Sequence, residues 1–146
     1  MIIIKSKQEI GLMREAGKVT GYILNELKNI IKPGISTMDI DRFVEKTVKE
    51  HGMIASEKGY CGFPGSVCTS INEEVVHGIP SKKRILREGD IVSVDVGAFI
   101  GGFHGDCAAT FACGEISAEA QDLIRVTRES FFEGIKFAKQ GYRVQD

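Results

Sequence analysis

The sequence feature that most constrains the fold is a pair of β-rich runs, residues 91–98 and 103–111, on either side of Gly101-Gly102. The first run alternates isoleucine and valine with smaller or polar residues, and the second begins and ends with phenylalanine. Such a composition suits a pleated, half-buried surface. Two runs of this kind joined by a short glycine-containing segment are typical of a β-hairpin. The sequence therefore predicts two antiparallel strands here.

Each predicted strand carries one aspartate that matters for function, Asp95 in the first and Asp106 in the second. A two-residue loop at Ile100-Gly101, or a four-residue loop over residues 99–102, predicts a register in which Asp95 directly faces Asp106. Directly opposed side chains have Cβ atoms about 4.5 to 5.5 Å apart, so two like charges there oppose folding. A cation would turn that cost into a binding site, because hard oxygen ligands on rigid strands suit divalent metals. Two solvated aspartates, or a pair sharing a proton, are the alternative interpretations.

Two amphipathic helices are expected before the hairpin. Apolar residues recur at steps of three and four over residues 8–31, which is the period of a helix. Ser36 or Thr37 can cap a second helix that runs to about residue 50. Asp39 and Asp41 fall in its first turn, where the helix dipole favours acidic side chains.

A third helix is expected after the hairpin, capped by Ser117 and running to about residue 139. Residues 53–80 are rich in glycine, proline, serine and cysteine, which indicates short strands and loops. The sequence therefore predicts an α+β chain. A lysine, a glycine and an aspartate follow two of the expected helices at matching offsets: Lys32, Gly34 and Asp39, then Lys139, Gly141 and Asp146. This short match suggests an internal repeat.

Composition excludes several classes of partner. Nineteen basic and twenty acidic side chains leave a formal net charge of −1, so no global field attracts DNA or an anionic membrane. No apolar run approaches the roughly 20 residues of a membrane span, and the opening run is too short for a signal peptide. The four cysteines form no CxxC pair and are expected to be reduced thiols. We therefore expect a cytoplasmic protein that binds neither a membrane nor specific DNA.

Three further polar residues need an interpretation. His77 lies in a loop between valines and a Gly-Ile-Pro segment, where a surface or packing role is the simpler reading. His104 shares a predicted strand face with Asp106, and we expect it to orient a carboxylate rather than bind a metal itself. Asp90 follows Glu88-Gly89 at the entry to the first strand, which indicates a structural turn residue.

Four motifs resemble, in order and spacing, the signature of the methionine aminopeptidases: residues 60–73 (YCGFPGSVCTSINE), 77–80 (HGIP), 89–95 (GDIVSVD) and 102–106 (GFHGD). The opening segment, residues 4–17, is similar to the first helix of the bacterial type I enzymes. The resemblance covers essentially the whole chain, and the combined motifs are highly specific. It implies a pita-bread fold, in which two pseudo-symmetric αβ halves enclose a metal site. Residues 1 to about 113 would form the first half, and residues from about 117 to 146 would begin the second.

The resemblance also implies roles for individual residues. Asp95 would chelate one of two divalent metal ions (cobalt, manganese, iron or zinc), and Asp106 would bridge both. His77 would contact the substrate amide and help to stabilise the transition state. The pocket for the methionine side chain would be lined by three residues: Tyr60, Phe63 and Cys68. A thioether packs well against aromatic edges and a soft sulfur.

In the family, one histidine and two glutamates from the second half complete the metal shell, and a second histidine approaches the substrate. None of these has a counterpart in this chain, since the late glutamates are expected on a solvated helix: Glu115, Glu119, Glu129 and Glu133. Two carboxylates alone would hold metals weakly.

Two functions therefore compete. The first is a metalloaminopeptidase that removes the initiator methionine from nascent proteins at the ribosome by a metal-activated water, with weak or no activity in this truncated chain. The second is a noncatalytic fragment that self-associates through an exposed apolar face or complements a missing second half. A proline-specific pita-bread peptidase fits the motifs less well.

Overall fold

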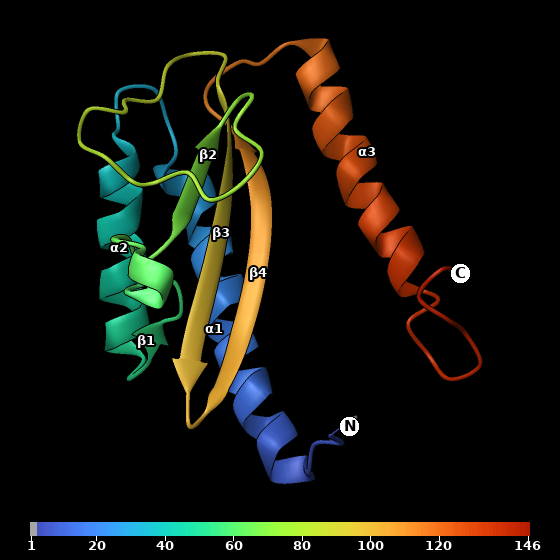
Figure 1. Ribbon diagram of the computed structural model, residues 1–146. Coiled ribbons are helices and arrows are strands. Elements are labelled where there is room, and N and C mark those ends of the chain that lie inside the picture. The colour runs from blue at the N-terminus through green and yellow to red at the C-terminus, as the bar shows by residue number, and fades with distance from the viewer. Residues whose placement is uncertain (1–2) are drawn as a thin grey trace.

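The computed structural model describes residues 3–146, and this part of the chain forms one four-stranded sheet with three α-helices. Figure 1 shows α1 crossing the back of the sheet, α2 beside it, and α3 standing apart from both. The elements in chain order are α1 (Lys7–Ile30), α2 (Thr37–Glu50), β1 (Ile54–Ala55), a 3-10 turn η1 (Tyr60–Gly62), β2 (Cys68–Ile71), β3 (Ile91–Ile100), β4 (Phe103–Ala112) and α3 (Ala118–Ile135). The α+β prediction is confirmed.

Each helix begins at a serine cap, as expected for an orphaned first turn of backbone N–H groups. Ser36, not Thr37, caps α2, and its backbone N–H donates to Asp39 in a capping box. Ser117 caps α3 as predicted, but the helix ends at Ile135 instead of near residue 139. Gly134 lies in its last turn, where glycine weakens a helix by about 1 kcal/mol.

The register of the hairpin differs from the predicted one. Gly101 and Gly102 form the two-residue turn, with φ of 57° and 91°, and Ile100 pairs with Phe103. Two successive positive φ angles favour glycine at both positions, so Ile100 stays in the strand. Asp95 therefore pairs with Ala108 and Asp106 pairs with Gly97, and the predicted direct pairing of the aspartates is wrong.

The two aspartates nevertheless share one sheet face, because the register shift is an even number of residues. They become diagonal neighbours, whose separation of about 7 to 8 Å is still within reach of their side chains. Strand β3 lies at the middle of the sheet: β4 pairs along one edge, while β2 and β1 pair in turn along the other. The sheet face that carries the two aspartates is thus three strands wide.

The opposite face of the sheet forms the hydrophobic core with α1. Alternate residues of β3 are fully buried there: Val92, Val94, Val96 and Ala98. Gly105 of β4 lets the helix approach closely, since a Cβ atom at this position would lie 2.3 Å from the backbone nitrogen of Gly17. The α1 side contributes Ile23 and Leu27, both with no exposed surface.

The short sequence repeat corresponds to a repeated local structure. Gly34 after α1 and Gly141 after α3 both have a positive φ, 94° and 97°. Two residues further on, the backbone N–H of Ser36 donates to Asp39 at 2.9 Å, and that of Arg143 donates to Asp146 at 2.7 Å. The division into halves near residues 113 and 117 stays a prediction.

Helix α3 contains no buried residue. It and the following turn expose a row of large apolar side chains: Leu123, Val126, Phe131, Phe132, Ile135, Phe137, Tyr142 and Val144. The predicted exposed apolar face is therefore confirmed. The late glutamates, including Glu119 and Glu129, are exposed as expected. Within residues 3–146, no helix has the length and apolar character needed to cross a bilayer.

Candidate metal and substrate site

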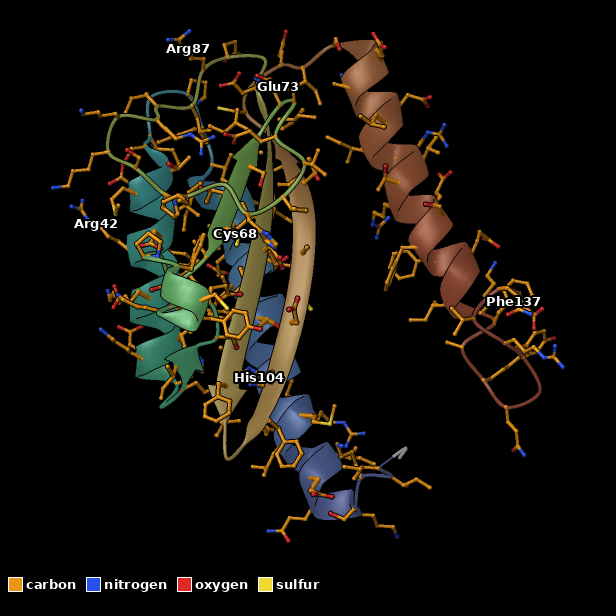
Figure 2. All side chains as sticks on the ribbon, viewed as in Figure 1. Arg42, Cys68, Glu73, Arg87, His104 and Phe137 are labelled. Atoms are coloured by element: carbon orange, nitrogen blue, oxygen red, sulfur yellow. The ribbon has the colours of Figure 1, made fainter. Side chains whose placement is uncertain are left out.

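A cavity of about 600 Å³ opens over the face of the sheet that α1 does not cover. Its lining comes from the 56–64 segment, β2, the 77–79 loop, β3 and β4: Ser56, Glu57, Tyr60, Cys61, Gly62, Phe63, Pro64, Cys68, His77, Ile79, Asp95, His104 and Asp106. Figure 2 shows Cys68 and His104 on this side of the sheet. The resemblance implies roles for five residues in addition to Cys68, and all five line the same cavity: Tyr60, Phe63, His77, Asp95 and Asp106.

Asp95 and Asp106 interact at the floor of this cavity. Burial raises the pKa of the Asp95 carboxyl above its ordinary value, and the charge of Asp106 and a hydrogen bond to its carboxyl add to the rise. The pair is thus unfavourable without a counter-charge, and its oxygen donors fit a hard divalent cation. Within residues 3–146, however, no group of three or more acidic, histidine or cysteine side chains is arranged to hold a metal ion. The two aspartates can form only part of a metal shell.

His77 projects from a tightly held loop. Its φ is 59°, an unusual value for a residue with a side chain. The next residue, Gly78, packs so closely on β2 that a Cβ there would lie 2.0 Å from the carbonyl oxygen of Thr69. Its N–H donates to Ser70 Oγ at 3.1 Å, and its carbonyl accepts from Thr69 N–H at 2.8 Å. These contacts hold the backbone next to His77, whose exposed imidazole lines the cavity. The ring lies near enough to Asp95 for a charge on it to offset part of the rise in that residue's pKa.

The residues expected to line a side-chain pocket differ in exposure. Cys68 is buried on β2 and pairs directly with Asp95 of β3. Burial, with help from Asp95, Glu57 and Asp106, raises the pKa of the Cys68 thiol to about 11. It is therefore a neutral packing group and not a nucleophile. Phe63 is half-buried, whereas Tyr60 on η1 is 74% exposed and forms the rim.

Two predictions about polar residues need correction. His104 was expected to orient a carboxylate, but it pairs with Phe99, and its Nδ1 lies 2.8 Å from Ser56 Oγ rather than from a carboxylate oxygen. Asp41 does not serve the helix dipole alone. It is buried and accepts a hydrogen bond at 2.6 Å from the backbone N–H of Ser66. Asp41 thereby anchors the segment that leads into β2.

Two other expectations are confirmed. Asp90 accepts hydrogen bonds from Asn72 at 2.9 Å and from the backbone N–H of Arg87 at 2.8 Å, so it organises the turn into β3. The four cysteines are free thiols, as expected.

Glu57 is the site residue that sequence reasoning missed. It lies in a polar stretch, Ser56-Glu57-Lys58, that reads as a solvated loop. In the structure its carboxyl enters the cavity, and burial is the main cause that raises its pKa to about 7, with Asp95 and Asp106 adding to the rise. No local sequence pattern marks Glu57, because its place depends on the pairing of Ala55 with Ala98, which brings the next residues over the face that carries the two aspartates.

Comparison with known proteins decides which family has this arrangement. The model of metallopeptidase family M24 matches residues 11–146. The chain belongs to this family. Among curated relatives, methionine aminopeptidase from Clostridium acetobutylicum is 58% identical over all 146 residues, and methionine aminopeptidase 1 from Bacillus subtilis is 49% identical. The chain spans 58% of the length of each.

Solved structures agree with this assignment to the M24 family. The methionine aminopeptidase of Thermotoga maritima superposes with a TM-score of 0.91 at 43% identity, covering 93% of this chain and 55% of that one. Prolidase from Pyrococcus furiosus, at 21% identity and a TM-score of 0.74, covers 87% of this chain and 36% of its own and shares the fold alone. The pita-bread fold class and the resemblance to bacterial methionine aminopeptidases are therefore confirmed.

Proposed function

We propose that this chain carries part of a methionine aminopeptidase site, in which Asp95 and Asp106 bind divalent metal ions and the cavity above them receives a peptide N-terminus. The observation that carries this proposal is the pair of interacting carboxylates on one sheet face at the cavity floor. The relatives of this chain suggest the substrate class, because methionine aminopeptidases align with its whole length.

Each cavity residue has a role in this proposal. Metal ions, when bound, would polarise the scissile carbonyl and activate water. Asp95 and Asp106 would hold and orient them from rigid strands. His77, whose loop is held against β2 through Gly78, would contact the substrate amide next to the reacting carbon. The first side chain of the peptide would pack against Phe63, Cys68 and Tyr60, with an apolar thioether suiting these surfaces.

A second function, metal binding without turnover, is favoured by one observation. The described residues contribute two interacting carboxylates but no larger set of ligands arranged for a metal. Weakly held metals would activate water poorly. In this case the exposed apolar side chains of α3 would serve self-association or a complementary chain. A cytoplasmic location and the ribosome as the source of nascent substrates stay predictions.

Hydrolysis of a Met-Ala-Ser peptide by this chain, with added Mn²⁺ or Co²⁺, separates the two functions. The complete Clostridium acetobutylicum relative serves as positive control, and Asp106→Asn serves as the matched negative control. Hydrolysis that both chelator and Asp106→Asn abolish supports the aminopeptidase. Metal binding without hydrolysis supports the second function, and the absence of both contradicts the site assignment.

A further inference from the structure

The loop that carries His77, residues 74–79, has open space on both sides. A second hollow of about 570 Å³ lies against it, lined by the loop itself and by Arg84. His77 and Ile79 line both this hollow and the cavity over the two aspartates. Among residues 3–146, no backbone–backbone hydrogen bond involves Val75, Val76 or His77. The loop is therefore a thin wall, and contacts at its two ends set its place.

One side chain, that of Arg84, contacts both ends of this loop. Its Nη2 pairs with the Glu74 carboxylate at the start. Its Nη1 donates to the carbonyl oxygen of Ile79 at the end and to that of Thr69 on β2, each at 3.4 Å. Glu74 also accepts a hydrogen bond at 2.8 Å from the backbone N–H of Ile71. The guanidinium thus joins the start of the loop, its end and the adjacent strand, which suits its planar fork of donors.

Arg84 is itself held by backbone contacts with the start of α2. Its carbonyl oxygen accepts a hydrogen bond at 2.9 Å from the N–H of Thr37, and the next residue, Ile85, forms an isolated β-bridge with Ser36. The side chains of Arg84 and Glu74 are 26% and 39% exposed. Ion pairs this exposed add little to global stability. The consequence of this pair is therefore local, because it restrains one loop.

We propose that Arg84, through its ion pair with Glu74, is a positioning residue for His77. The contacts of Gly78 hold only the last part of the loop to β2, and the Arg84 pair adds the first part. Loss of the guanidinium leaves Val76 and His77 free to move into the hollow behind them. The inference rests on the proposed function, in which the imidazole placed in this way contacts the substrate amide.

Amide ¹⁵N relaxation of the metal-free chain tests this positioning without a substrate. We expect order parameters of about 0.85 for Val76 and His77 in the wild type and below about 0.6 in Arg84→Ala, with β3 unchanged. Glu74→Ala should have the same effect, and the double variant should add nothing to either single one, because the two side chains act as one pair. The matched control is Arg87→Ala, which should leave the loop unchanged, since Arg87 is exposed at the edge of the molecule (Figure 2) and lines neither the hollow nor the cavity.

Mn²⁺ binding gives a second readout, which reports where the imidazole lies relative to the metal site. Paramagnetic broadening depends steeply on distance. A displacement of about 1 Å in Arg84→Ala should therefore change the ratio of Mn²⁺ broadening at the His77 ring to that at the His104 ring by about two-fold. His104 is the internal reference because it lies on β4. The Mn²⁺ affinity itself should stay as in the wild type, since Arg84 does not line that cavity.

The outcomes separate a positioning role from a general structural one. Rigid Val76 and His77 amides in Arg84→Ala would overturn the inference, as would an unchanged broadening ratio. A loss of order that extends into β3, or a weaker Mn²⁺ affinity, would mean that Arg84 supports the whole site and would also overturn it. Glu74→Ala keeps the test decisive if Arg84→Ala does not fold. The proposed function fails separately, when Mn²⁺ binding does not depend on Asp106, and the order parameters then still decide the inference.

Discussion

The two faces of the central hairpin have opposite roles in this molecule. One face packs valines and Ala98 of β3 against α1 so closely that Gly105 meets the helix backbone. The other face carries Asp95, Asp106 and the intruding carboxyl of Glu57, and it stays open to the cavity. Because successive side chains of a strand point to opposite faces of the sheet, neighbouring residues of β3 and β4 face these two different environments. Packing on the covered face therefore stabilises the fold, and this stability offsets the unfavourable close spacing of the carboxylates on the other face.

The largest expected effect comes from filling the covered face. Gly105→Val should destabilise the chain by about 3 kcal/mol, because its Cβ would collide with the backbone of α1 at Gly17. The matched change on the other face of the same strand, Ala108→Val, adds a β-branched residue at an exposed position. It should alter stability by less than about 0.5 kcal/mol. Urea unfolding measures both, and similar losses in the two variants would contradict the division of roles.

The second effect is a pH dependence that belongs to the site face. The pKa of Glu57 is raised from 4.5 to about 7, so the folded state binds its proton more tightly than the unfolded state does. Its contribution is most favourable below pH 4.5 and is lost as the pH rises through 7. With solvent screening of this half-buried group, the loss is about 1 to 2 kcal/mol.

Urea unfolding of the wild type and Glu57→Gln in a chelator, at pH values from 5 to 8, measures this dependence. Glu57→Gln should show a flatter profile, with a gain in stability relative to the wild type that grows with pH. Parallel profiles for the two proteins would show that the Glu57 carboxyl imposes no such cost.

Much of this architecture follows from the sequence. The apolar period of α1 and the serine caps are local signals, and each specified an element close to its observed bounds. The hairpin register required a choice between neighbouring turns, and the conformational freedom of two successive glycines decided it. Both aspartates stayed on one face because the error was even in residue number.

The missed parts of the site depend on tertiary contacts. Glu57 enters the cavity because β1 pairs with the end of β3 and Gly97 leaves space for it, and no local pattern encodes that coincidence. Asp41 looks like a first-turn acid until Ser66 is seen to donate to it. The contacts that hold the backbone next to His77 are likewise tertiary, since they join Gly78 to β2. These residues read as ordinary surface positions in isolation.

The smallest expected effect extends the comparison from faces of a strand to whole helices. Val19 on α1 is 6% exposed, whereas Val126 on α3 is 47% exposed. Val126→Ser should change the free energy of unfolding by less than about 0.5 kcal/mol, but Val19→Ser should cost about 2 kcal/mol or more. Sedimentation of the Val126→Ser protein also tests whether the exposed side chains of α3 drive self-association. A large destabilisation by Val126→Ser would mean that α3 is packed in solution.

The most direct test of the central claim is a calorimetric titration of Mn²⁺ into the metal-free chain, its Asp95→Asn variant and its Asp106→Asn variant. The account predicts binding by the wild type that each substitution weakens at least about 10-fold, since each removes one of the two interacting carboxylates. Ala108→Val, on the same face but without an oxygen donor, should bind as the wild type does. Unchanged Mn²⁺ affinity in both asparagine variants would contradict the assignment of Asp95 and Asp106 as metal ligands.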